Sequence, residues 1–263
     1  SNFKSNILKN DDLNDPVTVA DLKVNDLIIK RINKKYENID WEILSEENVK
    51  IEKNYLKNNS DWIWVLDPLD GTKDFIQGTG NYAMHLALNY KKKPLIGIVL
   101  IPEKDELWIT DGKKVWCENR KGLIRKTNLS SKRNLQDMVL VTSKNHNNLI
   151  LKNLIEKIKC NQVITMGSIG CKIASILRGE SDFYICLSLP GKSSPKDWDF
   201  AAPQSILKAA GGSITNLDNE ELSYGMLNYE QQGVIVASSD LVSHESLCLQ
   251  IKEILVKNNI LPV

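Results

Sequence analysis

Asp67 and Asp70 are two carboxylates, three positions apart, that follow the apolar, strand-like segment 62–66. Pro68 stiffens the turn expected between them, and Gly71 removes the Cβ where the backbone must bend or meet a ligand closely. Carboxylates that converge in this way suit Mg²⁺, which keeps several waters and takes phosphate oxygens from a substrate. If a helix begins after Gly71, its first N–H groups would face that phosphate. Asp, Pro and Gly also form plain acidic turns, but directly after an apolar strand the pattern favours a metal-dependent phosphate site.

The spacing of the acidic, histidine and cysteine residues does not fit other metal sites or thiol chemistry. Asp67 and Asp70 are too far apart for an Asp-x-Asp phosphatase nucleophile, and the alternating acids and distal Glu of an EF-hand are missing. The three histidines do not have the spacing of zinc ligands. The five cysteines are scattered without a C-x-x-C, which indicates reduced thiols that pack in the core.

Two further acidic segments have ordinary explanations when each is taken alone. The pair Glu46-Glu47 follows a strand-like segment at 41–44, and paired glutamates are common on protein surfaces. Asp199 stands near the start of an expected helix, where a carboxylate stabilises the helix N-terminus. Neither segment predicts a site by itself.

Taken together, the acidic segments resemble the inositol monophosphatase superfamily of Mg²⁺-dependent, Li⁺-sensitive phosphatases. The matching segments are V-T-V-A-D at 17–21, S-E-E at 45–47, W-V-L-D-P-L-D-G-T at 64–72 and W-D-F-A-A at 198–202. Their order and spacing agree over essentially the whole chain, which is identified as a member. The family usually has a long helix before V-T-x-A-D, where about 16 residues stand here. We therefore expect either that this helix is missing from the chain or that the member is short.

The residues after D-G-T indicate a branch of the superfamily. Lys73-Asp74-Phe75 resembles the K-[DE]-[FY] of 3′(2′),5′-bisphosphate nucleotidases, whereas inositol monophosphatases usually continue with T-N-F. Ser168 and Lys172 resemble the G-S-x-x-K of the nucleotidases with one extra residue, so Lys172 is not assigned to the substrate. The segment 187–196 matches no motif that we can interpret.

The resemblance implies a Mg²⁺-dependent phosphomonoesterase that hydrolyses adenosine 3′,5′-bisphosphate to AMP and phosphate in sulfur metabolism. An inositol monophosphatase or a sugar (bis)phosphatase with the same mechanism is the alternative. A remoter one is a non-catalytic protein that binds metal or nucleotide. Loss of catalytic function predicts a missing carboxylate or threonine, yet all the expected ones are present: Asp21, Glu46, Asp67, Asp70, Thr72 and Asp199.

The resemblance also implies two to three Mg²⁺ ions and assigns residues to them. Glu46, Asp67 and the Leu69 carbonyl would bind the first ion. Asp67, Asp70 and Asp199 would bind the second, and Glu46 would orient a third ion through water. The implied catalytic residues are Asp21, Glu46 and Thr72. In this scheme Asp21 orients the Thr72 hydroxyl, and Thr72 orients a metal-activated water and helps to deprotonate it. The implied substrate-binding residues are Glu46, Leu69, Asp70, Gly71, Thr72, Lys73, Ser168 and Asp199, with Lys73 steering an anionic substrate and Asp74 as its possible ion-pair partner.

Mixed helices and strands must position these residues. Residues 18–21 resemble a helix capping box, and residues 1–16 read as loop. Expected strands are 41–44, 62–66, 82–90, 95–101, 107–110, 115–118, 139–142, 163–166, 182–187, 213–215 and 234–237, with those of the first half spaced like antiparallel neighbours. Further helices are expected at 148–159, 169–177, 198–210 and 241–257, and residues 48–60 as loop or short helix.

The fold implied by the resemblance is an α/β protein, an αβαβα five-layer sandwich of the inositol monophosphatase / fructose-1,6-bisphosphatase type. It would form one compact unit with an N-terminal α+β subregion, 1–130, that carries the acidic metal motifs. The C-terminal α/β subregion, 131–263, would carry the Trp-Asp motif and the specificity elements. The two would meet near 125–140.

Composition limits the class of protein. The 263 residues include 34 basic and 33 acidic side chains, for a formal net charge of +1, so a binder of nucleic-acid polymers is not expected. Its 42% hydrophobic residues are typical of a globular protein, and the longest apolar run is too short to span a membrane. We expect a cytoplasmic monomer or homodimer whose partner is a small phosphate ester.

Overall fold

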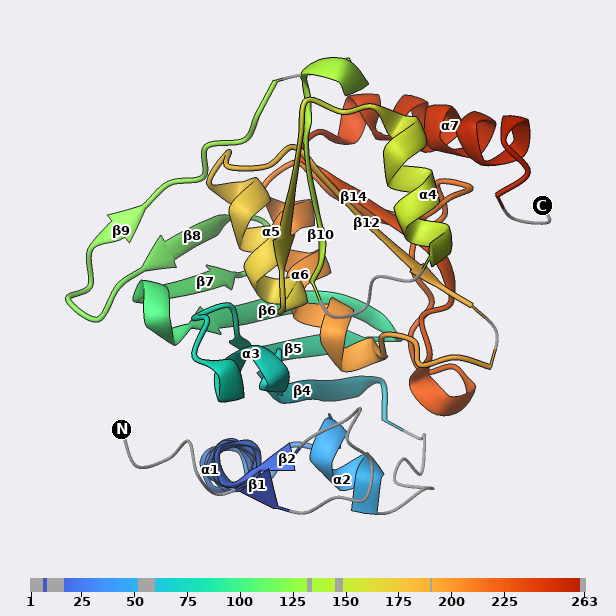
Figure 1. Ribbon diagram of the computed structural model, residues 1–263. Coiled ribbons are helices and arrows are strands. Elements are labelled where there is room, and N and C mark those ends of the chain that lie inside the picture. The colour runs from blue at the N-terminus through green and yellow to red at the C-terminus, as the bar shows by residue number, and fades with distance from the viewer. Residues whose placement is uncertain are drawn as a thin grey trace.

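Five layers of secondary structure stack as helices, sheet, helices, sheet and helices (Figure 1). The computed structural model describes residues 7–8, 17–51, 60–131, 134–144, 149–189 and 191–260. Helices of the three helical layers are, in order, α1 (Val19–Lys35) and α2 (Glu46–Ile51), then α5 (Ile169–Leu177) and α6 (Asp197–Ala209), then α4 (Leu149–Ile158) and α7 (Leu241–Lys257). This arrangement confirms the predicted αβαβα sandwich.

The first sheet has seven strands in chain order. They are β3 (Glu42–Ser45), β4 (Trp62–Asp70), β5 (Ala83–Tyr90), β6 (Lys93–Ile101), β7 (Glu106–Thr110), β8 (Val115–Glu118) and β9 (Ile124–Arg125). Every neighbouring pair is antiparallel except β3 and β4, which are parallel and connected through α2. The antiparallel arrangement predicted from the spacing of the strands is confirmed, because short connections can join only antiparallel neighbours.

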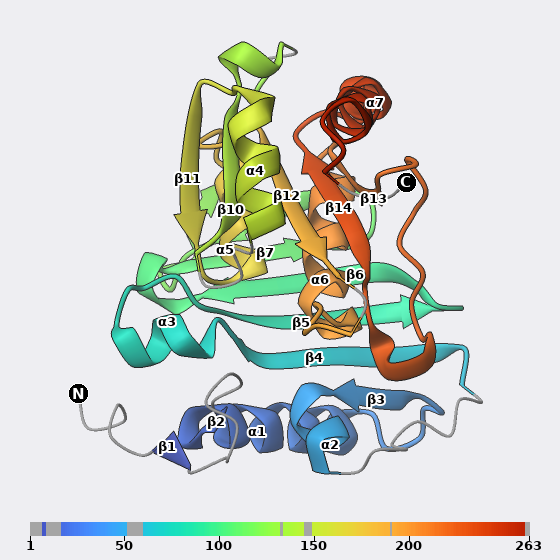
Figure 2. The same ribbon diagram turned by 45° about the vertical axis from the view of Figure 1, so that its right-hand side comes forward.

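The second sheet has five strands and mixed directions. Their order is β11 (Gln162–Met166), β10 (Val139–Ser143), β12 (Phe183–Ser188), β14 (Gly233–Ser238) and β13 (Ser213–Asn216). β10 is parallel to β11 and β12, whereas β14 is antiparallel to both of its neighbours. The helices that alternate with these strands cover both faces of the sheet (Figure 2).

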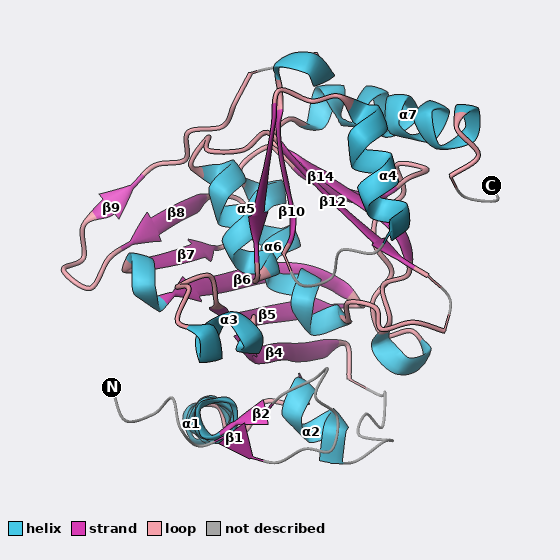
Figure 3. Ribbon diagram, viewed as in Figure 1, coloured by secondary structure: helices cyan, strands magenta, loops and turns pink. Residues whose placement is uncertain are grey.

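Two predicted loops contain structure. Within 1–16, β1 (Ile7–Leu8) pairs with β2 (Val17–Thr18), and a two-residue strand has no period by which its sequence could reveal it. The predicted turn after Asp67 is instead the continuation of β4 to Asp70. The segment 48–60, predicted as loop or short helix, begins within the short helix α2, which ends at Ile51, and residues 52–59 lie outside the described residues (Figure 3).

Three clusters of buried apolar side chains fill the spaces between layers. One lies between α1 and the outer face of the first sheet and includes Ile32, Leu66 and Leu86. The largest surrounds α5 and α6 between the two sheets, and the third joins α4 and α7 to the second sheet. Among the described residues, no helix is both long and apolar enough to cross a membrane.

Helix α6 approaches the first sheet very closely. A Cβ at Gly97 of β6 would lie 1.9 Å from the Ser205 hydroxyl oxygen and 2.8 Å from the Ala202 carbonyl oxygen. Pro203 lies within this helix and cannot donate to the carbonyl of Asp199 four residues earlier. The glycine in the sheet therefore fixes the distance between β6 and the helix that carries Asp199.

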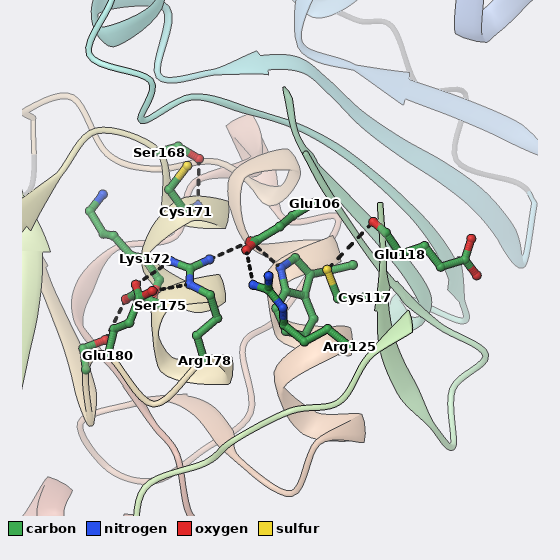
Figure 4. Close-up of polar contacts among 12 residues, drawn as sticks. Glu106, Cys117, Glu118, Arg125, Ser168, Cys171, Lys172, Ser175, Arg178 and Glu180 are labelled. Carbon is green, nitrogen blue, oxygen red and sulfur yellow. Dashed lines mark hydrogen bonds and ion pairs between the residues drawn. The ribbon is translucent and has the colours of Figure 1, made fainter. Parts of the chain in front are cut away.

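A buried ion network holds the C-terminal end of α5 to the first sheet (Figure 4). Arg178, which caps the helix, contacts Glu106 of β7 at 2.7 Å and Glu180 at 2.6 Å. The side chains of Arg178 and Glu106 are 7% and 6% exposed. Glu106 also accepts from Trp108 and Arg125, so breaking this network would leave a buried charge unpaired.

The two sheets divide the chain near the predicted boundary. Strands of the first sheet end at Arg125 and those of the second begin at Val139. Since α5 and α6 come from the second half and pack on the first sheet, we keep the subregions 1–130 and 131–263 as parts of one unit. That division stays a proposal.

His244 of α7 is a buried histidine outside the acidic cluster. Its Nε2 lies 2.8 Å from the Thr215 hydroxyl oxygen, and its Nδ1 lies 2.7 Å from the Ser238 hydroxyl oxygen. Both ring nitrogens are therefore paired with neutral partners, and burial lowers the pKa of His244 to about 4. The unfolded chain binds this proton near pH 6.5, so protons favour the unfolded state between these two values.

We expect His244→Gln to flatten the acid side of the stability curve. In the wild-type protein the neutral form of His244 contributes to the free energy of unfolding above about pH 6.5. This contribution is lost as the pH falls towards 4 and amounts to roughly 3 kcal/mol in all. The measurement is the difference in unfolding free energy between the two proteins, from urea titrations between neutral pH and pH 4. If the difference in unfolding free energy between the two proteins did not change with pH, the lowered pKa of His244 would be contradicted.

Candidate active site

A bulge in β4 places Asp67 and Asp70 on the same face of the sheet. In the register with β5, Asp67 pairs with His85 and Asp70 with Ala83, so three steps on β4 oppose two on β5. Side chains three positions apart in a regular strand point to opposite faces, and one extra residue reverses the second of them. Pro68 is compatible with this irregularity because it has no N–H to donate. The bulge turns both carboxylates towards α5 and α6.

Asp199 completes a cluster of three carboxylates. One oxygen from each of Asp67, Asp70 and Asp199 lies within 4.8 Å of the others. Asp199 is the third residue of α6, where its side chain accepts from the Lys196 N–H in front of the helix. The structure thus brings together residues that are 132 positions apart in the chain, 199 minus 67.

Glu46 belongs to the same electrostatic group. It begins α2 and forms an ion pair of 2.9 Å with Lys50. Burial, followed by the negative charges of Glu46 and of the other carboxylates in the cluster, raises the pKa of Asp67 well above its ordinary value. Burial, followed by the negative charges of Asp70 and Glu46, likewise raises the pKa of Asp199 well above its ordinary value. The charges of the other predicted ligands therefore act on Asp67 and on Asp199, and the assignment of these carboxylates to metal ions stays a prediction.

The donor set fits a hard divalent cation. The cluster consists of carboxylate oxygens, the ligands that Mg²⁺ takes from proteins. The raised pKa values of Asp67 and Asp199 show that the protein alone does not offset their charge. Lys50 pairs with Glu46 at the edge of the group, whereas burial lowers the pKa of His85 and of Lys172, the basic side chains nearest to Asp70 and Asp199. A bound cation would supply the missing positive charge.

Thr72 and Asp21 form the predicted pair beside the cluster. The Thr72 hydroxyl lies 3.2 Å from Asp21 Oδ1 and 3.0 Å from the Leu69 carbonyl oxygen. Asp21 is the third residue of α1 and also accepts from Thr18, which confirms the predicted capping box. Burial raises the pKa of Asp21. Since a hydroxyl has one proton, Thr72 donates to Asp21 when the Leu69 carbonyl is otherwise engaged.

The start of α5 holds Asp70. Its Oδ2 accepts from the Ser168 hydroxyl at 2.6 Å and from the Ile169 and Gly170 N–H groups at 2.5 and 3.2 Å. The positive end of the α5 dipole therefore stabilises this carboxylate. Ser168, predicted to bind substrate, is fully buried and contacts a cluster carboxylate.

Gly71 and Lys73, both predicted to bind substrate, lie at the start of α3 (Thr72–Gln77). Gly71 has a φ of 87° and caps this helix, and a Cβ there would lie 2.9 Å from the Asn81 carbonyl oxygen. Lys73 stands in the first turn of α3, partly exposed, and makes no hydrogen bond or ion pair within the described chain. Asp74 is buried and accepts from the Thr79 hydroxyl at 2.5 Å. Asp74 therefore serves the structure of the loop.

Several residues of the site were not predicted. His85 lies 3.2 Å from Asp70, and Asn25 of α1 holds the strand before Glu46 through Ser45. Asp197 accepts from the Gly225 N–H at 2.6 Å and from the Gln231 side chain at 2.7 Å, so it anchors the segment 223–231 beside Asp199. None of these residues has a local motif, and only the strand register or the packing reveals them.

Comparisons with known proteins agree with this geometry. A model of the inositol monophosphatase family matches residues 1–255. The chain belongs to the inositol monophosphatase family. This membership confirms the resemblance found in the sequence and indicates a phosphatase.

Relatives within the family carry different names. The chain is 32% identical to the 3′(2′),5′-bisphosphate nucleotidase CysQ of Buchnera aphidicola over 216 residues, which cover 81% of this chain and 76% of the relative. It is 28% identical to the Nus factor SuhB of Pasteurella multocida, over 89% of this chain and 82% of the relative. Among solved structures, a Thermotoga maritima IMPase has a TM-score of 0.75 at 22% identity and covers 96% of this chain and 89% of that one. That likeness shows the fold.

Lys172 illustrates how this chain departs from the nucleotidase motif. Its side chain is 1% exposed, and its Nζ donates to the Gly167 carbonyl at 2.6 Å and lies 5.5 Å from the centre of the Tyr184 ring. Burial lowers the pKa of Lys172. In this conformation the Lys172 ammonium is engaged by the Gly167 carbonyl and the Tyr184 ring in the interior.

We expect Asp67→Asn to stabilise the metal-free protein while abolishing stabilisation by Mg²⁺. The substitution keeps an oxygen for the Leu69 N–H, 3.0 Å away, but removes the charge that its neighbours repel. The gain in EDTA should be about 1 to 2 kcal/mol, whereas saturating Mg²⁺ should stabilise only the wild type, by roughly 3 kcal/mol at a hundred times the dissociation constant. Thermal unfolding with EDTA or Mg²⁺ measures both. Equal stabilisation of both proteins by Mg²⁺ would contradict the metal assignment.

Proposed function

We propose that this chain is a Mg²⁺-dependent 3′(2′),5′-bisphosphate nucleotidase that hydrolyses adenosine 3′,5′-bisphosphate to AMP and phosphate. The observation that carries the phosphatase chemistry is the meeting of Asp67, Asp70 and Asp199 within 4.8 Å, beside Thr72 and Asp21. Family membership supports the same chemistry. The nucleotide specificity rests on the similarity to CysQ and on the Lys73-Asp74-Phe75 segment.

The carboxylates would hold two to three Mg²⁺ ions. Asp67 would be shared between two of them, with Glu46 and the Leu69 carbonyl on one side and Asp70 and Asp199 on the other. Bound ions would offset phosphate charge and activate a water. Because the carboxylates come from β4, α2 and α6, the protein fixes their separation before any substrate arrives.

Thr72 and Asp21 would handle the proton of the attacking water. When Thr72 donates to Asp21, its hydroxyl oxygen keeps lone pairs that can accept from a water on the cluster side. Burial raises the pKa of Asp21, which makes this carboxylate a better proton acceptor than an exposed one. Asp21 thus orients Thr72 and helps it to take the proton.

The substrate would lie over the start of α3. The N–H groups near Gly71 and Thr72 would contact the scissile phosphate, and Glu46, Leu69, Asp70, Ser168 and Asp199 would complete its surroundings. Lys73 has no protein partner in the described chain, so its charge is available for the second phosphate of a bisphosphate. We propose a role in sulfur metabolism and sensitivity to Li⁺ on the same family grounds.

Inositol monophosphate or a sugar phosphate is the rival substrate. One observation favours it, since Lys172 of the nucleotidase-like segment is buried and donates to the Gly167 carbonyl. Function depends on the specificity elements around a shared fold, so the fold does not decide between the substrates.

The decisive assay compares phosphate release with Mg²⁺ from adenosine 3′,5′-bisphosphate, inositol 1-phosphate and fructose 1,6-bisphosphate. We expect kcat/KM to favour the nucleotide by about a hundredfold, or roughly 2.7 kcal/mol of differential transition-state binding. A flat profile or a sugar preference would keep the phosphatase chemistry and overturn the nucleotide assignment. Absence of release from all three would overturn both.

We expect Thr72→Val to lower kcat by about a hundredfold or more, because it removes the hydroxyl that positions and deprotonates the water. Thr72→Ser keeps that hydroxyl and should retain most of the activity. The matched control is Thr79→Val, which removes another threonine–aspartate hydrogen bond, to Asp74, outside the cluster. Steady-state kinetics of the three variants give the answer. A Thr72→Val enzyme no slower than the Thr79→Val enzyme would eliminate the proton role of Thr72.

A further inference from the structure

His85 lies in β5, directly behind the acidic cluster, and is fully buried. The strand register pairs it with Asp67, so its side chain points to the same face as the cluster. Its Nε2 lies 3.2 Å from Asp70 Oδ2, and its Nδ1 lies 3.4 Å from the Trp198 carbonyl oxygen. One imidazole ring therefore contacts two elements that carry predicted metal ligands, the end of β4 and the start of α6.

Within the part of the chain that the structure describes, the Asp70 carboxylate is the nearest polar partner of His85 Nε2. Among the described residues, Nε2 has no well-aligned hydrogen bond, and its nearest charged neighbour is the Asp70 carboxylate. A neutral imidazole carries one N–H, and a carboxylate attracts it more strongly than a more distant carbonyl does. We therefore assign the proton to Nε2, facing Asp70, so Nδ1 carries a lone pair and its approach to the Trp198 carbonyl oxygen is a packing contact.

The chain around this contact leaves room for the ring. A Cβ at position 170 would lie 2.2 Å from His85 Nε2, so the ring reaches Asp70 only because Gly170 has no side chain. The Gly170 N–H also donates to Asp70 Oδ2, together with Ser168 and Ile169. This oxygen is thus surrounded by donors from α5 and by the His85 ring, whereas Oδ1 takes part in none of these contacts.

We propose that His85 is a positioning residue for metal binding, whose Nε2–H fixes the Asp70 carboxylate while the ring packs against the start of α6 next to Asp199. Carboxylates that ligate a metal bind it with full affinity only when neighbouring groups hold the orientation of these carboxylates. Here one ring fills the space between Asp70 and the start of α6, so its loss would let the Asp70 carboxylate turn away from the second predicted ion site. This inference rests on the proposed metal-dependent function.

The test measures Mn²⁺ binding by electron paramagnetic resonance titration of the intact protein, without substrate. His85→Leu should weaken one Mn²⁺ site by about tenfold or more, the usual effect of removing such a group. His85→Gln should restore most of the affinity, because its amide nitrogen can occupy the place of Nε2. If His85→Leu does not fold, His85→Ala removes the ring without adding bulk and carries the same expectation.

His244→Leu is the matched control, because it removes another buried histidine with two polar contacts, far along the chain from the acidic motifs. It should lower stability and leave Mn²⁺ affinity unchanged. Wild-type affinity in His85→Leu would overturn the proposal, and so would an equal loss in His85→Leu and His244→Leu. Asp70→Asn separates this failure from that of the proposed function. If that variant also binds Mn²⁺ like the wild type, the metal assignment itself is wrong.

Discussion

The mutual repulsion of buried carboxylates is the constraint on which the site depends. Asp67 and Asp199 are held close to Asp70 and Glu46, where burial and like charge raise the pKa of both. A chain free to relax would separate these groups or let water between them. The sandwich prevents this separation, because each carboxylate stands on an element whose opposite side is packed in an apolar cluster. The free energy of packing thus offsets a local destabilisation that a divalent cation would relieve.

The two central helices transmit this constraint between the sheets. The start of α5 donates to Asp70, and its end is fixed to Glu106 of the first sheet through Arg178. Helix α6 is held to β6 at the distance that Gly97 permits, with Asp199 in its first turn. Both helices therefore meet the cluster at their N-terminal ends, where helix dipoles favour negative charge. The same dipoles that stabilise the metal-free carboxylates also fix their direction.

Local sequence predicted most of the elements and named the carboxylates that the fold brings together. Alternating and helical apolar patterns predicted the main strands and helices, and the capping box of Thr18 and Asp21 formed as expected. What the pattern missed was short or irregular: the two-residue strands β1 and β9 and the extension of β4 through Asp70. Such features depend on pairing with a distant strand, and no local period reports that pairing.

The acidic residue types at their spacing determined the family, the phosphate chemistry and the set of candidate ligands, because hard cations select carboxylate oxygens wherever they occur. Tertiary structure decided how those ligands are used. The bulge that puts Asp67 and Asp70 on one face, the burial of Lys172 and the contact of His85 with Asp70 follow from strand register and from layers packing at close distance. These relations join residues far apart in the chain, and only the folded core brings them within reach of one another.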